Sequence, residues 1–459
     1  MTREIPIHYG DSFFANGSSF TNAPLDFLLG MAETYPEIFK FRLGPMTVTM
    51  VTKPELVREV LVTKSKRFPK WERDVKILGR FLGRGLVTSQ GDHHKKQRKM
   101  SQPAFHMKRI ISYADIMSNY ATDMVDTWED QSVIDISQEM LRVTMYIVTK
   151  TIFDVDKEVM VDQANRIGEA IHRLQQLTDQ DMSTPIDLPE WLPIPLNIKR
   201  RRERKVLDSA IHDIITTRRQ PGPDGRIEDR GDLLSMLLLS QEEDDSFLTA
   251  QELRDQVVTL FGAGHETTSN ALTWTMYALG QNPDVMAKLQ AEIDDVLDGR
   301  TPNYQDLANL PYTEMVIKEA MRLHPSVWSL NARYATEDTM IGDYKIDAES
   351  VIFIAPYVLH HLSEHFENPK TFDPERFSTE NESNIQKYSY LPFGAGPRVC
   401  IGQAFAMMEA RLILATMIQN YEFEMVPDQT ITPLPLITMS IQEGLKMKVT
   451  NRAQVPAFA

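Results

Sequence analysis

Residues 393–402 form a glycine-rich stretch around a cysteine, and they read Phe393-Gly394-Ala395-Gly396-Pro397-Arg398-Val399-Cys400-Ile401-Gly402. Cys400 is the only cysteine among 459 residues, so any sulfur chemistry must occur here. Gly394, Gly396 and Gly402 carry no side chain, which allows the backbone to pass close to a large flat group. The stretch therefore predicts a loop that holds a bulky ligand.

The residues after this loop are apolar at helical spacing: Ala404, Phe405, Met407, Met408, Leu412, Ala415 and Met417. We therefore expect Cys400 to lie just before the N-terminus of a helix, where the helix dipole favours a thiolate over a thiol. Taken alone, a single intracellular cysteine is more often a small buried apolar residue.

The loop resembles the haem-binding signature of the cytochrome P-450 family. Phe393, Gly396, Arg398, Cys400 and Gly402 match that signature at every position. The resemblance implies that Cys400 is the axial thiolate ligand of haem iron and pushes electron density onto the metal, which favours O–O cleavage. It also implies that Arg398 pairs with a haem propionate and that Phe393 packs beside the sulfur.

A long helix is predicted from the capping box of Thr249 and Glu252 to about Gly280, with Pro283 just beyond. Such a helix of about 30 residues is on the order of 45 Å long. Its centre holds glycines and threonines that disfavour a helix: Phe261-Gly262-Ala263-Gly264-His265-Glu266-Thr267-Thr268. A hydroxyl there can bond a backbone carbonyl and open the helix locally, although glycines that permit close helix packing would explain the pattern equally well.

The same segment matches the oxygen-activation motif of the family through Ala263, Gly264, Glu266 and Thr267. The resemblance implies that Thr267 steadies the bound oxygen and that Glu266 relays protons to it through water. The pair His265-Glu266 also resembles the start of a zinc-protease motif, but that motif's second histidine is absent because position 269 is serine.

Glu319 and Arg322 lie on one face of a helix predicted over 312–323. A surface ion pair, which contributes little stability, is the default interpretation. The family, however, joins this Glu-any-any-Arg pattern to the arginine of Pro374-Glu375-Arg376-Phe377. The resemblance implies a buried triad of Glu319, Arg322 and Arg376 that locks the fold around the haem.

Other cationic positions match the family less fully. The resemblance implies that His94, Arg98, Arg333 and His361 hold haem propionates through charge-assisted hydrogen bonds. From composition alone, the basic run 93–99 fits a solvated helix face equally well, and its lysines could also belong to the docking face for an acidic electron donor. His361 also has metal-ligand spacing with His365, but no third ligand completes a site.

Apolar residues are expected to line a substrate pocket, and the candidates are Trp71, Val327, Trp328, Leu330 and Met439. A second basic run, 199–205, resembles a nucleic-acid or membrane patch in isolation. The net charge of −15 and the absence of aromatic residues within the run favour a solvated helix face instead.

The composition of the chain limits where the protein can be located and how its domains can be organised. The sequence has no apolar run of about 18 residues and no signal-peptide core, and a lone cysteine excludes an internal disulfide framework. We therefore expect a cytoplasmic protein from a reducing compartment. No linker divides the chain, so residues 1–459 are predicted to form a single domain without a fused reductase.

The sequence is thus identified as a member of the cytochrome P-450 family. The resemblance implies a mainly α fold with small β-sheets and one haem b buried between the long central helix and the Cys-loop helix. It implies a monooxygenase that inserts one oxygen atom from O2 into an apolar organic substrate by hydroxylation or epoxidation. No nucleotide-binding or iron–sulfur motif is present, so a ferredoxin or flavodoxin and its reductase must deliver NAD(P)H electrons. Fatty acids, terpenoids, steroids and aromatic compounds all fit an apolar pocket.

Two other functions remain open. A haem-thiolate enzyme that uses peroxide or rearranges its substrate would keep Cys400 but often lose the acid and alcohol, so Glu266 and Thr267 argue against it. A non-enzymatic haem-binding sensor predicts no substrate-dependent oxygen consumption.

Overall fold

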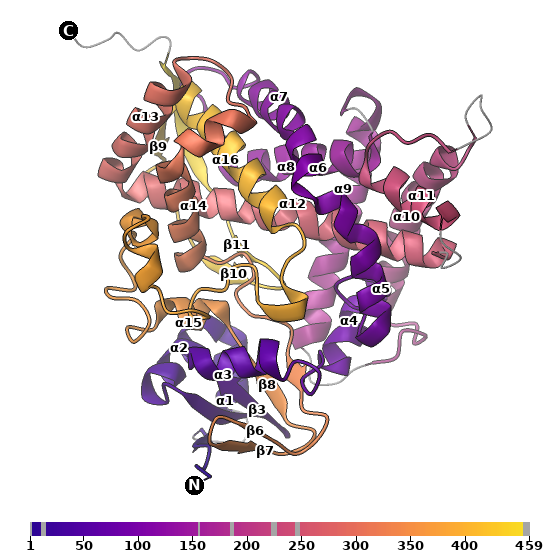
Figure 1. The fold of residues 1–459 in the computed structure, drawn as a ribbon, viewed down its shortest axis with the longest axis vertical. Coiled ribbons are helices and arrows are strands. Elements are labelled where there is room, and N and C mark those ends of the chain that lie inside the picture. The colour runs from indigo at the N-terminus through magenta and orange to yellow at the C-terminus, as the bar shows by residue number, and fades with distance from the viewer. Residues whose placement is uncertain are drawn as a thin grey trace. The chain divides into compact units, whose positions relative to one another are not determined.

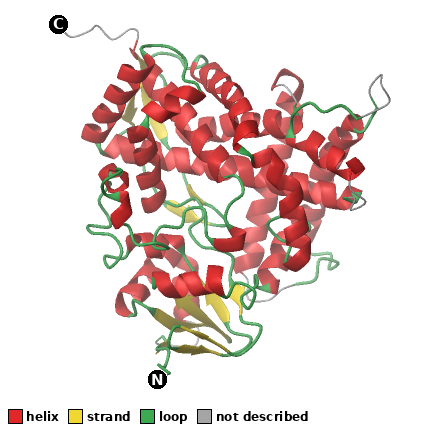
Figure 2. Ribbon diagram, in the orientation of Figure 1, coloured by secondary structure: helices red, strands yellow, loops and turns green. Residues whose placement is uncertain are grey.

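The computed structural model describes residues 2–10, 15–154, 157–183, 188–221, 227–243 and 248–452. Helices predominate and the sheets are small, as the sequence predicts (Figure 2). The chain divides into two compact units, each assembled from segments that are distant in sequence. Unit 1 comprises Met1–Val75, Glu314–Cys400 and Pro433–Ser440, and unit 2 comprises Lys76–Thr313, Ile401–Thr432 and Ile441–Ala459. The expectation of a single functional domain stays a prediction.

Unit 1 is built on a five-stranded sheet in the order β1-β2-β3-β8-β5. Strands β2 (Ile38–Leu43) and β3 (Met46–Val51) form the antiparallel hairpin at its centre, with Gly44 in the turn at φ +61°. Strand β8 (Val351–Phe353) pairs parallel to β3, and β5 (Arg333–Tyr334) pairs antiparallel to β8. Apolar side chains from the sheet and neighbouring helices form one core cluster, which extends to Leu391 near the cysteine loop.

The remaining elements of unit 1 are short. They are β1 (Ile7–His8), α1 (Ala15–Asn22), α2 (Pro24–Thr34), α3 (Pro54–Arg58), the π-helix η1 (Glu59–Thr63), β6 (Thr339–Ile341), β7 (Tyr344–Ile346), α15 (Pro356–His361), η4 (Pro374–Phe377), η5 (Glu382–Asn384), η6 (Gly396–Arg398) and β10 (Pro433–Pro435). Three elements contain a boundary between the units: α4 (Glu72–Leu82), α14 (Pro311–Leu323) and β11 (Met439–Ile441).

Unit 2 is mostly helical. It contains α5 (Gly91–Ser101), η2 (Gln102–Phe105), α6 (Met107–Ser112), α7 (Ala114–Val125), α8 (Ile136–Phe153), α9 (Lys157–Ser183), α10 (Pro195–Arg218), α11 (Leu233–Glu243), α12 (Ala250–Gln281), α13 (Pro283–Leu297), η3 (Tyr304–Asn309) and α16 (Gln403–Asn420). A small sheet in the order β4-β12-β9 joins Val133–Asp135, Lys446–Asn451 and Tyr421–Met425.

Helix α12 is the long helix that the sequence predicts, and it runs for 32 residues (Figure 1). Thr249 accepts the Glu252 backbone N–H, and the Glu252 carboxylate accepts the Thr249 N–H, so the capping box fixes where the helix begins. Helix α8 packs along α12, and a Cβ atom on Gly264 would lie 3.1 Å from the Val148 side chain. Gly264 therefore serves close helix packing, the alternative that the sequence left open.

The second basic run lies on α10, and the expectation of a fully solvated face is wrong for one member. Lys199 and Arg202 are exposed, but Arg200 is 2% exposed and its guanidinium lies 2.5 Å from Asp181 of α9. A carboxylate on the packed side of α10 supplies the counter-charge that permits this burial. No helix in the described residues is long and apolar enough to cross a bilayer.

Candidate functional site

Cys400 closes a tight loop in unit 1 that is held by its own backbone. The Cys400 N–H donates to the Phe393 carbonyl at 2.9 Å, and the Val399 N–H donates to the Gly396 carbonyl at 3.0 Å. Gly394 and Gly396 both have φ +69°, a left-handed conformation that side chains disfavour. The Cys400 thiol is exposed. The chain thus presents its one thiol from a backbone whose shape depends on glycine.

A steric constraint, in addition to the backbone conformation, requires glycine at position 396. A Cβ atom at this position would lie 2.2 Å from the carbonyl oxygen of Leu61, a residue of η1. Because the obstacle is backbone rather than a flexible side chain, any larger residue would push the loop away from η1. Gly394 has more room, since its nearest neighbour would be the Leu330 side chain at 3.9 Å.

Three basic side chains lie together near this loop. Lys70 and Arg333 face each other in an isolated antiparallel β-bridge, and each is 8% exposed. Burial and the charges of Arg333 and Arg398 hold the pKa of Lys70 well below its usual 10.5, and burial lowers the pKa of Arg333 to about 10. Within the described part of the chain, Nε of Arg333 is buried without a hydrogen-bond partner.

The acid beside these cations is Asp74. Burial raises the pKa of Asp74 to about 6, and its carboxylate accepts the Ala332 N–H at 3.0 Å. Burial disfavours the charged forms of basic side chains, and a bound anion stabilises those forms. The cluster is therefore suited to an anionic ligand with more than one carboxylate, and the two propionates of haem fit this requirement.

His361 lies at the end of α15 and does not add to this positive charge. Its ring stacks on Tyr357 with centroids 4.1 Å apart, and its Nδ1–H donates to the Tyr357 carbonyl at 2.8 Å. Burial lowers the pKa of His361 to about 4, so the ring is neutral at pH 7. His365 lies beyond the helix end, and its ring bonds the Thr52 carbonyl at 3.0 Å. Among the described residues, no group of three histidine, cysteine or acidic side chains could hold a metal ion.

The predicted triad forms around one carboxylate. Arg322 donates from Nε and Nη2 to the two oxygens of Glu319, each at 2.8 Å, and Arg376 Nε donates to Oε1 at 3.3 Å. Glu319 and Arg322 are fully buried. The other Arg322 donors reach the carbonyls of residues 360, 369 and 371. This cluster ties α14 to the end of α15, to the segment before η4 and to η4 itself.

The motif at the centre of α12 lies in unit 2, on a helix that continues without interruption from Ala250 to Gln281. The Thr267 hydroxyl donates to the Ala263 carbonyl at 2.8 Å, as the sequence predicts, but the expected local opening of the helix is absent from this segment. The Glu266 carboxylate accepts a hydrogen bond from Gln175 of α9. His265 is buried, its Nδ1–H donates to the Phe261 carbonyl at 2.8 Å, and burial lowers its pKa. His265 is therefore a structural residue.

His94 and Arg98 lie one turn apart on α5, also in unit 2. His94 is buried and Arg98 is half-buried, so this side of the basic run is not a solvated face. The end of α5 is attached to α12 because the Gln256 amide donates to the Ser101 hydroxyl at 2.5 Å.

The predicted pocket residues of unit 1 come mostly from the loop 326–330 and from the start of β11. The Trp328 indole N–H donates to the Leu436 carbonyl at 2.6 Å, and the Met439 N–H donates to the Ser326 carbonyl at 2.8 Å. Val327 and Leu330 are half-buried on the same loop. Trp71 comes from another segment, and the Arg73 guanidinium lies 5.5 Å from its ring centroid.

Sequence reasoning missed Lys70, Gln175 and Glu409. Lys70 and Gln175 are unremarkable in sequence, because only tertiary structure brings them to Arg333 and Glu266. Glu409 could have been found, since it lies within the apolar run of α16. It is fully buried beside Thr268, and burial raises its pKa well above 4.5.

Comparisons with known proteins find similar chains over nearly the whole length of this one. Residues 12–449 match the family model described as cytochrome P-450. Cyclooctatin synthase of Streptomyces melanosporofaciens is 37% identical over 91% of this chain and 89% of its own length. Cyclooctat-9-en-7-ol 5-monooxygenase of the same organism is 34% identical over 90% of each chain. The crystal structure of the cytochrome P-450DA heme domain matches with a TM-score of 0.88 and 25% identity, over 98% of both chains.

Proposed function

The chain belongs to the cytochrome P-450 family and is a haem-binding monooxygenase, and we propose that it oxygenates an apolar cyclic terpenoid with electrons from a separate redox protein. We propose further that residues 1–459 act as one haem domain. The observation that carries the assignment of the site is the cluster of three basic side chains at the loop of the sole cysteine, in which Lys70 and Arg333 are buried and Arg398 is half-buried.

Cys400 would supply the thiolate ligand of the iron. Arg398, Arg333 and Lys70 would hold the haem carboxylates, with His94, Arg98 and His361 as further contacts; the His361 ring can donate from Nε2 only when protonated. Phe393, Gly396 and Gly402 would shape the loop at the sulfur, and Ala263 would leave room for the haem face, whereas Gly264 packs against Val148 of α8. We propose that the haem is type b, since the thioether attachment of c-type haem would need cysteines beyond the one that serves as the ligand.

The triad of Glu319, Arg322 and Arg376 would retain the haem by keeping α14 and the η4 region fixed. Its role is structural, since the polar atoms of the three side chains form hydrogen bonds with one another and with backbone carbonyls.

When bound, the haem supplies the redox and oxygen chemistry. The protein would supply the protons through an acid and an alcohol on α12. The Gln175 amide orients the Glu266 carboxylate, and the Thr267 hydroxyl can turn from the Ala263 carbonyl to a water molecule or substrate oxygen. Gln175 therefore acts as a positioning residue for Glu266.

The substrate class rests on the relatives and on the apolar candidates for the pocket. The names of the two Streptomyces proteins refer to cyclooctatin and to a cyclic alkenol. Trp71, Val327, Trp328, Leu330 and Met439 would offer a mostly apolar surface, and the Trp328 N–H is already used by the Leu436 carbonyl. A cyclic terpenoid with few polar groups suits such a lining.

Turnover with defined electron sources tests the proposal. Haem-loaded protein would be supplied with NAD(P)H, ferredoxin and ferredoxin reductase, and offered cyclic terpenoids, fatty acids, steroids and simple aromatic compounds in parallel. We expect oxygen consumption and a monooxygenated product with a terpenoid, and little product when hydrogen peroxide replaces the reductase system. Equal turnover with peroxide alone would contradict the electron source, and preference for a fatty acid would contradict the substrate class.

A further inference from the structure

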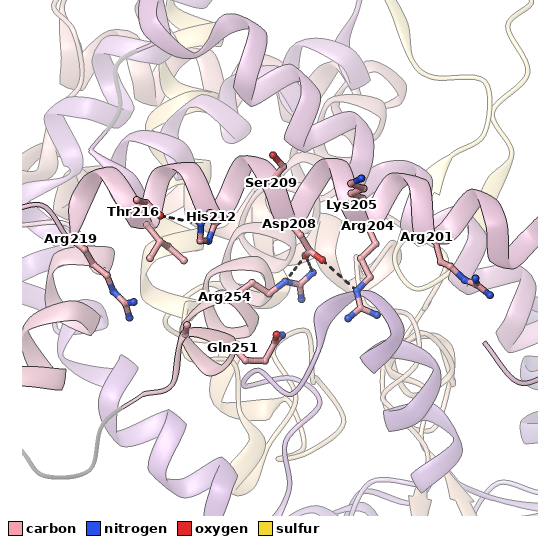
Figure 3. A pocket seen from close by; sticks show the side chains of 12 residues that line it. Arg201, Arg204, Lys205, Asp208, Ser209, His212, Thr216, Arg219, Gln251 and Arg254 are labelled. Atoms are coloured by element: carbon pink, nitrogen blue, oxygen red, sulfur yellow. Dashed lines mark hydrogen bonds and ion pairs between the residues drawn. The ribbon is translucent and has the colours of Figure 1, made fainter. Parts of the chain in front are cut away.

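A groove lies between α10 and the beginning of α12 in unit 2 (Figure 3). Its volume is about 670 Å³, within the usual range for small-molecule sites. The lining residues are Arg201, Arg204, Lys205, Asp208, Ser209, His212, Ile215, Thr216, Arg219, Ala250, Gln251 and Arg254. None of them belongs to the haem site described above.

The lining is strongly basic in a protein that is acidic overall. Five lining side chains are arginine or lysine and one is aspartate, an excess of four positive charges with His212 left aside. The whole chain carries a formal charge of −15. Charge of one sign gathered in a concave surface concentrates counter-ions there, so this excess implies attraction of anions to the groove.

The helical period explains why the charges converge. Arg201, Arg204, Lys205, Asp208, His212, Thr216 and Arg219 recur every three or four residues and therefore share one face of α10. Figure 3 shows these side chains along the helix, with Arg254 reaching toward Asp208 from the facing helix α12.

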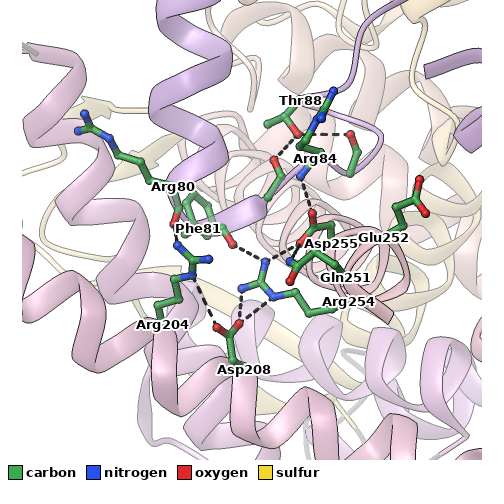
Figure 4. A network of polar contacts seen from close by, with 12 residues as sticks. Arg80, Phe81, Arg84, Thr88, Arg204, Asp208, Gln251, Glu252, Arg254 and Asp255 are labelled. Carbon is green, nitrogen blue, oxygen red and sulfur yellow. Dashed lines mark hydrogen bonds and ion pairs between the residues drawn. The ribbon is translucent and has the colours of Figure 1, made fainter. Parts of the chain in front are cut away.

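The acid in the groove already has partners. Asp208 Oδ1 accepts hydrogen bonds from Arg254 Nε at 2.7 Å and Nη2 at 2.5 Å, and Arg204 Nε lies 3.6 Å from Oδ2 (Figure 4). Arg254 is 8% exposed, and its Nη1 also donates to the Phe81 carbonyl at 2.9 Å. This network occupies the one carboxylate among the lining residues, so the lining holds no second carboxylate to balance Arg201 and Lys205.

Arg201 and Lys205 are exposed at the groove. Arg201 donates to the backbone carbonyl of Glu190 at 2.6 Å, a neutral acceptor that leaves its charge uncompensated. Arginine beside lysine is an arrangement that recognises phosphoryl oxygens, since the planar guanidinium can bind two oxygens at once and the ammonium adds a point charge.

We propose that this groove binds a small phosphorylated molecule through its phosphate or diphosphate group. A phosphoryl group carries up to two negative charges and several acceptor oxygens, which matches an excess of four positive charges better than a single carboxylate does. The concave shape and volume favour a small molecule over a nucleic acid or an acidic protein, which need an extended surface. This binding is independent of the haem and goes beyond the oxygenase activity proposed above.

Isothermal titration of the haem-loaded protein with inorganic pyrophosphate tests the proposal. The double variant Arg201→Gln/Lys205→Gln removes the two exposed lining charges and leaves the Arg254–Asp208 network intact. The matched control, Lys199→Gln/Arg202→Gln, removes the same charge from exposed positions of the same helix that do not line the groove. We expect saturable binding that weakens by about tenfold or more in the groove variant and changes by less than about twofold in the control.

Three results would overturn the proposal. The first is no saturable binding by the wild type, and the second is an equal loss in both variants, which would indicate non-specific attraction to α10. The third is binding confined to vesicles that contain phosphatidic acid, with none to pyrophosphate, because this would identify a lipid surface as the ligand. Circular dichroism and the haem spectrum of each variant verify that it is folded.

Discussion

Lys70 and Arg333, two buried cations, face each other in a β-bridge, and Nε of Arg333 has no hydrogen-bond partner among the described residues. Burial disfavours the charged forms of both side chains, and a bound anion would stabilise them. Stability and ligand retention should therefore respond in opposite directions when one cation is removed.

Arg333→Gln is expected to make the haem-free protein more resistant to urea, by about 1–3 kcal/mol, because an uncompensated buried charge is gone. The same variant should release haem faster to excess apomyoglobin, because a haem carboxylate has lost its partner. Lys66→Gln, which removes an exposed charge nearby, should change neither quantity. A haem-free variant that is less stable, or haem release at the wild-type rate, would show that Arg333 does not hold the cofactor.

Glu319→Gln is expected to lower the free energy of unfolding by about 3–5 kcal/mol, because it leaves the buried guanidinium of Arg322 without its carboxylate. Equilibrium unfolding in urea gives this difference. Glu314→Gln is the control on the same helix, since Glu314 forms a partly exposed ion pair with Lys318 at 3.0 Å and should cost less than about 1 kcal/mol. Equal losses in the two variants would mean that the triad is no more than a surface pair.

Gly396→Ala and Gly394→Ala should differ although both glycines have φ +69°. Left-handed backbone alone costs alanine about 1–2 kcal/mol, which is the expected loss at Gly394. Gly396→Ala should cost more and should also reduce haem content after purification, because its Cβ would meet the Leu61 carbonyl at 2.2 Å. Similar haem content in both variants would refute the packing argument.

Buried neutral histidine should contribute to acid unfolding. Burial and the charges of His361 and Arg322 lower the pKa of His324 from 6.5 to about 3. Between these two pKa values the His324 ring binds a proton in the unfolded chain but not in the folded chain. The free energy of unfolding therefore falls as the pH drops below roughly 6.5, by up to about 1.4 kcal/mol per pH unit down to pH 3. His324→Gln should flatten this decline in urea titrations between pH 7 and 4, whereas His172→Gln, at an exposed position, should not. An unchanged slope in His324→Gln would mean that other groups control acid unfolding.

Local signals predicted the elements that carry the site. The Thr249–Glu252 capping box correctly predicts the residue at which α12 begins, and the apolar spacing after Cys400 correctly predicts α16. Both signals can be read from the sequence because caps and periodicity are local properties of the chain. The resemblance to a known family predicted that Glu319, Arg322 and Arg376 form one cluster, and the structure contains that cluster.

Properties set by distant contacts could not be read from the sequence. The bridge between Lys70 and Arg333 joins segments far apart in the chain, and the burial of Arg200 depends on Asp181 of another helix. Composition favours a solvated face for the basic run on α10, because it does not show which residues of the run line a groove.

The reduced carbon monoxide difference spectrum tests the central claim, a bond between the Cys400 sulfur and haem iron, most directly. The purified native protein is predicted to show the long-wavelength Soret band of a thiolate-ligated haem, and Cys400→Ala is predicted to lose that band or the haem itself. A native protein that stays colourless when supplied with haemin, or a Cys400→Ala variant with an unaltered spectrum, would contradict the assignment.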